Sequence, residues 1–499
     1  MSDLMAWSAG NARMPAKVCY QYLGRLFLLL GLTLVLASCA WLTPSYEVPA
    51  LPVAARYPAD AEPGTDGVVA VQTDWRDYFP DPRLQALIAQ ALANNRDLRA
   101  ATLRVAEARS LYGIQRADRF PSVNAQADLY RSRTPADLSV TGAPLVASQY
   151  QVALGAASWE IDFWGRVRNL TDAALESYLA TDEGRRAATI GLVAQVANSY
   201  LVLRELDERI RLARQTIATR QESFRIFSRR VAVGSTSRLD LTQVETLLTQ
   251  AQTLVVQLEL ARALQAHALT LLVGAPVDLP PLQDRFDDQG LVREVRAGLP
   301  SDLIADRPDI IAAEHQLKAA NANIGAARAA FFPRVTLTAA FGTASMQFEN
   351  LFEPGSAAWN FAPSISLPIF NAGRLSNNLS LSEARRDLAV ANYESVVQNA
   401  FRNVSDALSA RKWLAEQVGI QQRALVAQTE RARLATLRYD SGAARYLEVL
   451  DAQRDLLDAE QQLVQTRRAL LSSSVNLYAA LGGGWQLSAP FSDKTDKTN

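Results

Sequence analysis

The sequence predicts a mainly α-helical chain with a smaller β part, built from two copies of one unit. Three observations over its 499 residues predict this class. Landmark residues recur in the same order in both halves, and two tracts of 131 and 121 residues contain no proline. Four short segments, two in each half, alternate polar and apolar residues, as half-buried strands do.

Composition and charge argue against nucleic-acid binding and against most enzymes. The 51 basic and 51 acidic residues cancel, and 49% of the chain is apolar. His267, His315, Cys19 and Cys39 are the only histidines and cysteines, and they form no metal-ligand or catalytic pattern. We therefore expect no nucleic-acid partner, no metal, no catalytic residue and no enzymatic activity.

The N-terminus has the features of a signal peptide for export. Residues 26–37 form a 12-residue apolar run, too short for the roughly 20 residues of a membrane helix and suited to a signal-peptide core. The run ends in Leu36-Ala37-Ser38-Cys39, which resembles the bacterial lipobox. We expect removal of residues 1–38 and lipidation of Cys39 with diacylglycerol and an N-acyl chain (palmitate), with no other cofactor. Either Met1 or Met14 could start the precursor.

The duplication rests on ordered landmarks. Those at an offset of 212 are Asp97, Gly113 and Phe120-Pro121, which match Asp309, Gly325 and Phe332-Pro333. Those at an offset of 208 are Gly165-Arg166, Gly234, Leu239 and Gly274, which match Gly373-Arg374, Gly442, Leu447 and Gly482. The repeats therefore cover 83–275 and 308–482.

Proline is excluded from helix interiors, so the proline-free tracts predict long helices that turn back at a glycine as coiled-coil hairpins. The first repeat is expected to hold a helix, two strands in 121–162, a long helix over 167–233 and a return helix over 239–272. The second is expected to hold a helix, two strands in 334–370, a long helix over 374–441 and a return helix over 447–481. Outside the repeats we expect a lipidated extended segment at 39–82, an equatorial linker at 276–307 and a polar tail at 483–499.

The strand segments have the length of membrane strands. Residues 335–341 and 359–369 alternate apolar and polar side chains, and the first repeat does the same. We expect them to mark strands of about 10 residues, enough to cross a bilayer when tilted. Four strands alone would leave open edges in lipid and fall short of the eight or so of the smallest membrane barrels. Several chains must share one barrel, and three would supply twelve strands.

The motifs in this order resemble those of TolC-type outer-membrane factors, in the lipoprotein branch typified by OprM and NodT. The resemblance runs from Cys39 to about Trp485. Its carriers are Phe79-Pro80-Asp81-Pro82, Asn95-Arg96-Asp97-Leu98, Trp164-Gly165-Arg166, Leu299-Pro300-Ser301-Asp302-Leu303, Arg307-Pro308-Asp309 and Leu447-Glu448-Val449-Leu450-Asp451, with the Phe-Pro and Gly-Arg landmarks.

The resemblance implies a homotrimer whose 12-stranded transmembrane β-barrel continues into a periplasmic helical tunnel. It implies an outer-membrane channel of a tripartite multidrug efflux system, embedded in outer-membrane lipid. Its partners would be a periplasmic adaptor (membrane fusion) protein and an inner-membrane pump of the RND type. The channel would export drugs and other toxic small molecules.

A closed end is expected where the long helices turn. Glu448 and Asp451 are three residues apart and share a helix face, so a threefold axis would make them two acidic rings. The family's gate carries two acids at these aligned positions, one of them Asp where this chain has Glu448. Tyr439 and Arg445 are further gate candidates, although the family's arginine aligns better with Ala444. Ordinary solvated helix charges are the alternative.

The two turns are the expected tips for docking. They are Gly234, Ser235, Thr236, Ser237 and Arg238 in the first repeat and Gly442, Ala443 and Ala444 in the second. By resemblance they receive the adaptor, whereas a helix cap and nothing more is the simpler reading.

Two other functions compete with the efflux channel. A structural lipoprotein could span the periplasm without transporting anything, but the strand–helix duplication argues against it. A stand-alone porin would need many more strands in one chain.

Overall fold

The computed structural model describes residues 42–54, 56–58, 68–281, 286, 292–296 and 306–484. The predicted signal peptide, Cys39 and residues 485–499 lie outside the described residues, as do parts of 39–82 and 276–307. The chain divides into two compact units. The strand unit holds the residues up to Glu47 with Leu111–Leu175 and Lys318–Asp387, and the helix unit holds Val48–Ser110, Glu176–Leu317 and Leu388–Asn499.

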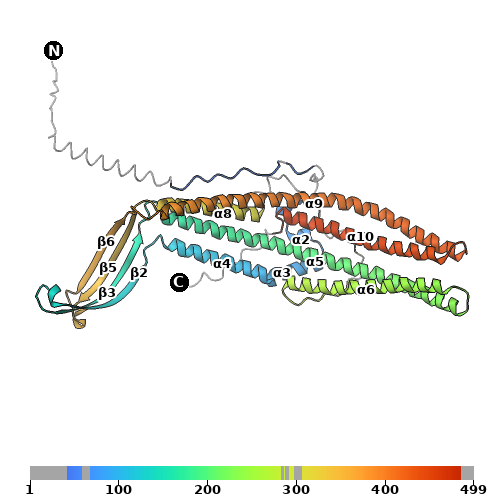
Figure 1. The fold of residues 1–499 in the computed structure, drawn as a ribbon, viewed down its shortest axis with the longest axis horizontal. Helices are drawn as coiled ribbons and strands as arrows, with labels where there is room; N and C mark the ends of the chain where they lie inside the picture. Colours follow the sequence, from blue (N-terminus) through green and yellow to red (C-terminus); the bar gives the residue numbers. More distant parts are fainter. Residues whose placement is uncertain are drawn as a thin grey trace, which may run out of the picture. The chain divides into compact units, whose positions relative to one another are not determined.

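Helices make up most of the chain, and the long ones come in two consecutive pairs (Figure 1). In chain order the helices are α2 (Trp75–Tyr78), α3 (Pro82–Asn94), α4 (Arg96–Ala117), α5 (Arg166–Ala232), α6 (Arg238–Val273), α8 (Pro308–Ala329), α9 (Arg374–Asp440) and α10 (Tyr446–Ala480). The strands are β1 (Val68–Val69), β2 (Val123–Thr134), β3 (Leu145–Glu160), β4 (Val295–Arg296), β5 (Arg334–Ser345) and β6 (Ala357–Ser366). The predicted fold class, mainly helical with four long strands in a duplicated chain, is confirmed.

The helix bounds differ from the prediction at one important place. A single helix was expected at the start of the first repeat, but α3 and α4 are separate because Asn95 has extended backbone. The Asn95 amide donates to the carbonyl of Leu272 at 2.8 Å and accepts the N–H of Leu98 at 2.9 Å. The break is therefore held by a bond to α6, which local residue preferences do not encode.

The strand unit contains a four-stranded antiparallel sheet in the order β2-β3-β5-β6. Its register aligns Ala125, Leu154, Phe341 and Trp359 in one row across all four strands. In an antiparallel ladder directly opposed residues share a face, so the apolar positions of every strand gather on one side. The last three of these side chains are 59, 69 and 76% exposed, so this apolar face has no covering layer within the described part of the chain.

The core of the helix unit joins segments from across the sequence. Tyr78 of α2 stacks on Tyr478 of α10 with ring centroids 3.9 Å apart, and both side chains are buried. The strands β1 and β4 pair in parallel, which joins the segment 39–82 to the linker 276–307. Within the segment predicted as extended, 39–82, the structure adds a short α-helix, α2, whose Trp75 and Tyr78 are buried in this core.

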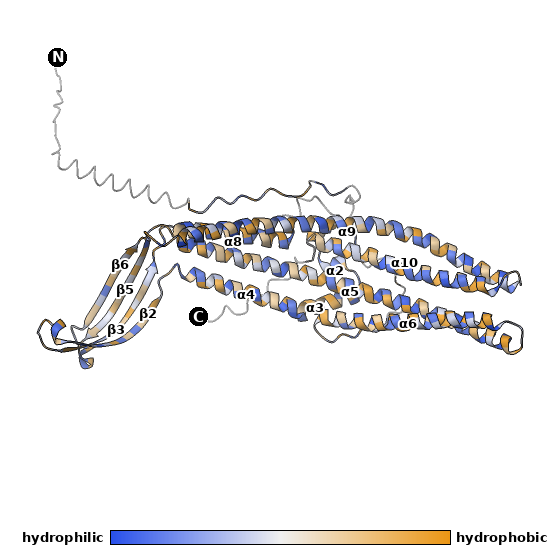
Figure 2. Ribbon diagram, viewed as in Figure 1, coloured by the Kyte–Doolittle hydropathy of each residue, from blue (hydrophilic) through white to orange (hydrophobic). Residues whose placement is uncertain are grey.

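Hydrophobic and hydrophilic residues intermix along the long helices (Figure 2). Among the described residues, no helix has the length and apolar character needed to cross a bilayer.

Candidate functional site

Two short turns join the long helices, and a glycine in left-handed conformation closes each. Gly234 lies between α5 and α6 with φ 70°, and Gly442 lies between α9 and α10 with φ 75°. The residue after each glycine donates its N–H to the carbonyl five positions earlier, over 2.8 Å in both turns. A Cβ at either position would meet no atom within 4 Å, so the backbone angle rather than crowding favours glycine.

The first turn is capped on the α6 side by a reciprocal pair. The Ser237 hydroxyl accepts the N–H of Asp240 at 3.1 Å, and the Asp240 carboxylate accepts the N–H of Ser237 at 3.3 Å. The Thr236 hydroxyl donates to the same carboxylate at 3.0 Å. The side-chain hydrogen bond from Ser237 is the largest cause that lowers the pKa of Asp240 below its usual value, followed by that from Thr236.

The second turn uses the equivalent carboxylate differently. Glu448 stands 208 positions after Asp240, but Arg445 takes the place of Ser237 and makes no side-chain cap on α10. Glu448 is therefore free of a capping role, and it pairs with Arg438 of α9 over 2.9 Å.

Asp451 also has an arginine partner in its own chain. Arg454 lies 3.2 Å from the Asp451 carboxylate and 3.0 Å from that of Asp455. Glu448 and Asp451 are both in α10, as their spacing predicts, and their side chains are 48 and 41% exposed. The sequence did not indicate these arginines, and the gate role of the two acids stays a prediction.

Tyr439 lies in a cluster that connects both hairpins. Arg230 of α5 donates a hydrogen bond to the Tyr439 hydroxyl, and its guanidinium lies 5.8 Å from the Tyr439 ring centroid. Tyr446 packs edge-on against Tyr439 with ring centroids 4.8 Å apart, and its ring is tilted against that of Phe227 of α5 at 4.4 Å. The Tyr446 hydroxyl lies 2.7 Å from that of Ser223. Burial is the largest cause that raises the pKa of Tyr446, so this phenol stays neutral.

Apolar packing and charge join the two turns further. Phe227, Val244 and Leu450, from α5, α6 and α10, form one buried cluster. Arg445 lies close enough to Asp240 for its charge to contribute to the lowered pKa of that carboxyl. The gate role of Arg445 stays a prediction.

The remaining tip residues are open to solvent. Most of the predicted docking positions are exposed, whereas Thr236 and Ala444 are half-buried. The adaptor-docking role of Gly234, Ser235, Thr236, Ser237, Arg238, Gly442, Ala443 and Ala444 remains a prediction.

Sequence reasoning missed Arg230, Phe227 and Tyr446. The duplication contained a signal for Arg230, because it is the repeat counterpart of Arg438, 208 positions later. For Tyr446, the signal was a second tyrosine seven residues after Tyr439, across the turn. Within the described ranges, no group of three or more His, Cys, Asp and Glu side chains could hold a metal ion.

Comparison with known proteins identifies the family. The pattern of the outer membrane efflux protein family matches residues 87–275 and again 299–483, so each repeat carries one match. Two relatives from Pseudomonas putida are the toluene efflux pump outer membrane protein TtgC and the antibiotic efflux pump outer membrane protein ArpC. Each is 45% identical over 456 residues, covering 90% of this chain and 94% of the relative.

A solved structure agrees over the same length. The open state of the Neisseria gonorrhoeae MtrE outer membrane channel superposes with a TM-score of 0.82 at 38% identity, covering 89% of this chain and 98% of that channel. The chain belongs to the outer membrane efflux protein family and is an outer-membrane channel component of an efflux system.

Proposed function

We propose that three copies of this chain complete one duct, which carries small toxic molecules out of the cell. The main support is the uncovered apolar face of the sheet together with the two strands that end it. Within the described residues, β2 and β6 each pair on one side only. Lipid cannot satisfy the unpaired backbone groups of such edges, whereas neighbouring copies can. Three copies supply twelve strands, a number within the range of closed membrane barrels.

The duct would work with an adaptor and an inner-membrane pump of the RND type. The exposed turns at Gly234 and Gly442 sit at the ends of long hairpins, where a partner can reach them without disturbing a core. We propose that these turns receive the periplasmic adaptor. Efflux pump components are what the relatives' names describe.

The gate would lie at the same turns. Glu448 and Asp451 supply negative charge near a converging mouth, and their pairs with Arg438 and Arg454 hold the side chains in place. The Arg230–Tyr439 bond ties the hairpins together beside them. Opening would then require the hairpins to separate at this contact.

The cargo and the anchor follow from different observations. TtgC is named for toluene and ArpC for antibiotics, so we propose small apolar solutes and antibiotics as cargo. We propose that Cys39 carries the lipid and that the protein needs no other cofactor and performs no catalysis. Transport then depends on passage alone.

Conductance across a planar bilayer tests the function. The purified full chain should give discrete channels, and Glu448→Ala combined with Asp451→Ala should raise their open fraction and, in cells, uptake of large antibiotics. Glu430→Ala is the control, because it removes an acid paired within α9 away from the turn. Absence of current from both the parental chain and the double variant would favour a structural lipoprotein. Unchanged uptake would remove the two acids from the gate.

A further inference from the structure

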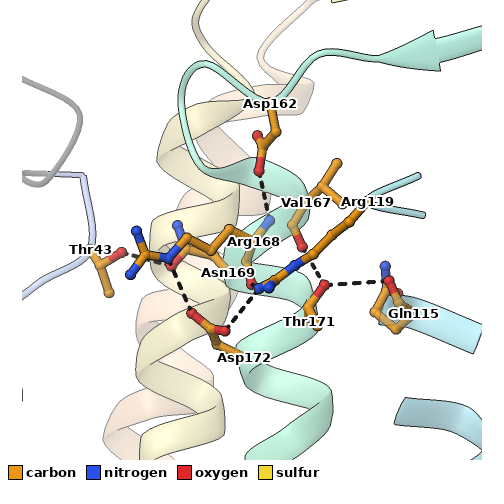
Figure 3. Close-up of polar contacts among 9 residues, drawn as sticks. All are labelled: Thr43, Gln115, Arg119, Asp162, Val167, Arg168, Asn169, Thr171 and Asp172. Carbon is orange, nitrogen blue, oxygen red and sulfur yellow. Dashed lines mark hydrogen bonds and ion pairs between the residues drawn. The ribbon is translucent and has the colours of Figure 1, made fainter. Parts of the chain in front are cut away.

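The first described residues after the predicted lipid site lie against two helices of the strand unit. The Thr43 hydroxyl donates to the side-chain amide oxygen (Oδ1) of Asn169, at the start of α5, at 2.8 Å (Figure 3). The Asn321 amide of α8 donates to the Pro44 carbonyl at 2.9 Å. Asn169 and Asn321 are 8 and 7% exposed. Two nearly buried amides on separate helices thus each bind residues 42–46, here called the strap.

Two cations of α8 hold the ends of the strap. Arg328 donates to the Leu42 carbonyl at 3.4 Å, and the Lys318 ammonium lies 5.3 Å from the centroid of the Tyr46 ring. The contacts therefore extend along the whole strap and use both its backbone and its side chains.

Gly325 of α8 makes the close approach possible. A Cβ at this position would lie 2.5 Å from Thr43 Oγ1 and 2.7 Å from Asn169 Nδ2. Real side chains do not tolerate such separations, so any larger residue must push the strap or Asn169 aside. Glycine in a helix interior is less favourable than alanine, and here the contact explains its presence.

The duplication supplies an empty counterpart. Gly113 of α4 is the repeat equivalent of Gly325, and a Cβ there would meet no atom within 4 Å. The same landmark residue therefore borders a packed strap in one repeat and open space in the other within the described residues.

The strap begins close to the strands. Three peptide units separate Leu42 from Cys39 in the sequence, a length of chain that spans at most about 11 Å. Leu42 is bound by Arg328, in the last turn of α8, and β5 begins shortly afterwards at Arg334. A lipid on Cys39 would consequently be held beside the base of the sheet.

We propose that Gly325, Asn169, Asn321 and Arg328 form a docking groove for the strap, which fixes the acylated N-terminus next to the strands. The bound strap keeps the lipid and the sheet close enough to meet the same membrane surface. Docking of the strap therefore promotes insertion of the strands and assembly of the channel. This inference rests on the proposed lipidation of Cys39 and the proposed assembly of the duct.

The test measures docking, acylation and assembly separately in the full chain. Thr43→Cys introduces a thiol whose reaction with a maleimide in isolated outer membranes reports release of the strap. Gly325→Leu should speed this reaction about tenfold, the factor that corresponds to roughly 1.4 kcal/mol. Gly113→Leu, the same change at the empty counterpart, should leave it unchanged. Asn321→Ala removes one bond without adding volume and should speed it by a smaller factor.

Each readout decides a different step. If the Thr43→Cys chain reacts with the maleimide at the same rate alone and combined with Gly325→Leu or Asn321→Ala, the docking groove is overturned. The heat-resistant oligomer should fall about threefold in Gly325→Leu, the factor that corresponds to roughly 0.65 kcal/mol, and an unchanged oligomer despite faster labelling would overturn the role in assembly. Mass spectrometry of the N-terminal peptide should find the lipid in every variant. A parental peptide without lipid would overturn the anchor role, even with the groove intact.

Discussion

The guanidinium of Arg230 and the phenol of Tyr439 form a hydrogen bond that joins α5 to α9 beside both helix turns. Neighbouring rings extend this contact, because Phe227 lies against Arg230 and Tyr446 packs against Tyr439. The C-terminal ends of α5 and α9 are far apart in the sequence, and this bond joins them in space. Separation of the two hairpins at the turns would have to break this bond.

Removal of this bond should favour the open channel. Tyr439→Phe keeps the ring and loses the acceptor, and Arg230→Ala loses the donor. A partly exposed bond to a charged group contributes about 1 kcal/mol, so each change should raise the open fraction about fivefold. Single-channel recording measures this fraction. Because both variants break one contact, the double variant should open little more than either alone; fully additive effects would show that the two residues act separately.

The cap on α6 should depend on pH. Hydrogen bonds from Ser237 and Thr236 lower the pKa of Asp240 in the folded chain. A lowered folded pKa means that the stabilisation is complete above the unfolded value of about 3.9 and is lost as the pH falls through the folded value. Hydrogen exchange of the first turn of α6, corrected for intrinsic rates, should thus be constant near neutral pH and rise in acid.

Two variants separate the parts of this cap. Asp240→Asn should remove the acid dependence, because the amide does not titrate. Ser237→Ala should destabilise the turn by about 1 kcal/mol at neutral pH. Acid-induced exchange that persists in Asp240→Asn would assign the titration to another group.

The glycine turns test the role of backbone conformation. Gly442→Ala places a Cβ on a residue with φ 75°, which costs roughly 1–2 kcal/mol. Local opening should then increase, and tryptic cleavage after Arg445 should speed up about fivefold or more. Gly442→Asn is the matched control, since asparagine tolerates this conformation better. Equal cleavage of the alanine and asparagine variants would mean that crowding by a partner, rather than φ, selects glycine.

The features that the sequence predicted correctly depend on interactions between residues close together in the chain. Proline exclusion marked the helices and the alternation of polar and apolar residues marked the strands, because both depend on neighbours in the chain. Tertiary contacts account for the failures. The helix break at Asn95 needs the Leu272 carbonyl, and the Glu448–Arg438 pair follows from a missing cap at Arg445. Gly113 and Gly325 are one landmark in sequence, and only packing distinguishes them.

An added positive charge should lower the yield of assembled protein on one face of the sheet and be tolerated on the other. Leu154 lies on the apolar face in the row with Phe341, whereas Gln151 lies on the other face, opposite Asp128 and Ala344. If the apolar face meets lipid, Leu154→Arg places a cation in hydrocarbon at a cost of about 2–4 kcal/mol near the midplane, while Gln151→Arg adds it to an aqueous lumen. The yield of heat-resistant oligomer in outer membranes should fall steeply for Leu154→Arg and stay near parental for Gln151→Arg. The reverse order would place the lumen on the apolar side, and equal losses would mean that both faces are packed against protein. Because both variants carry the same new residue on the same strand, the difference reports the surroundings of each face rather than a general intolerance of β3 to arginine.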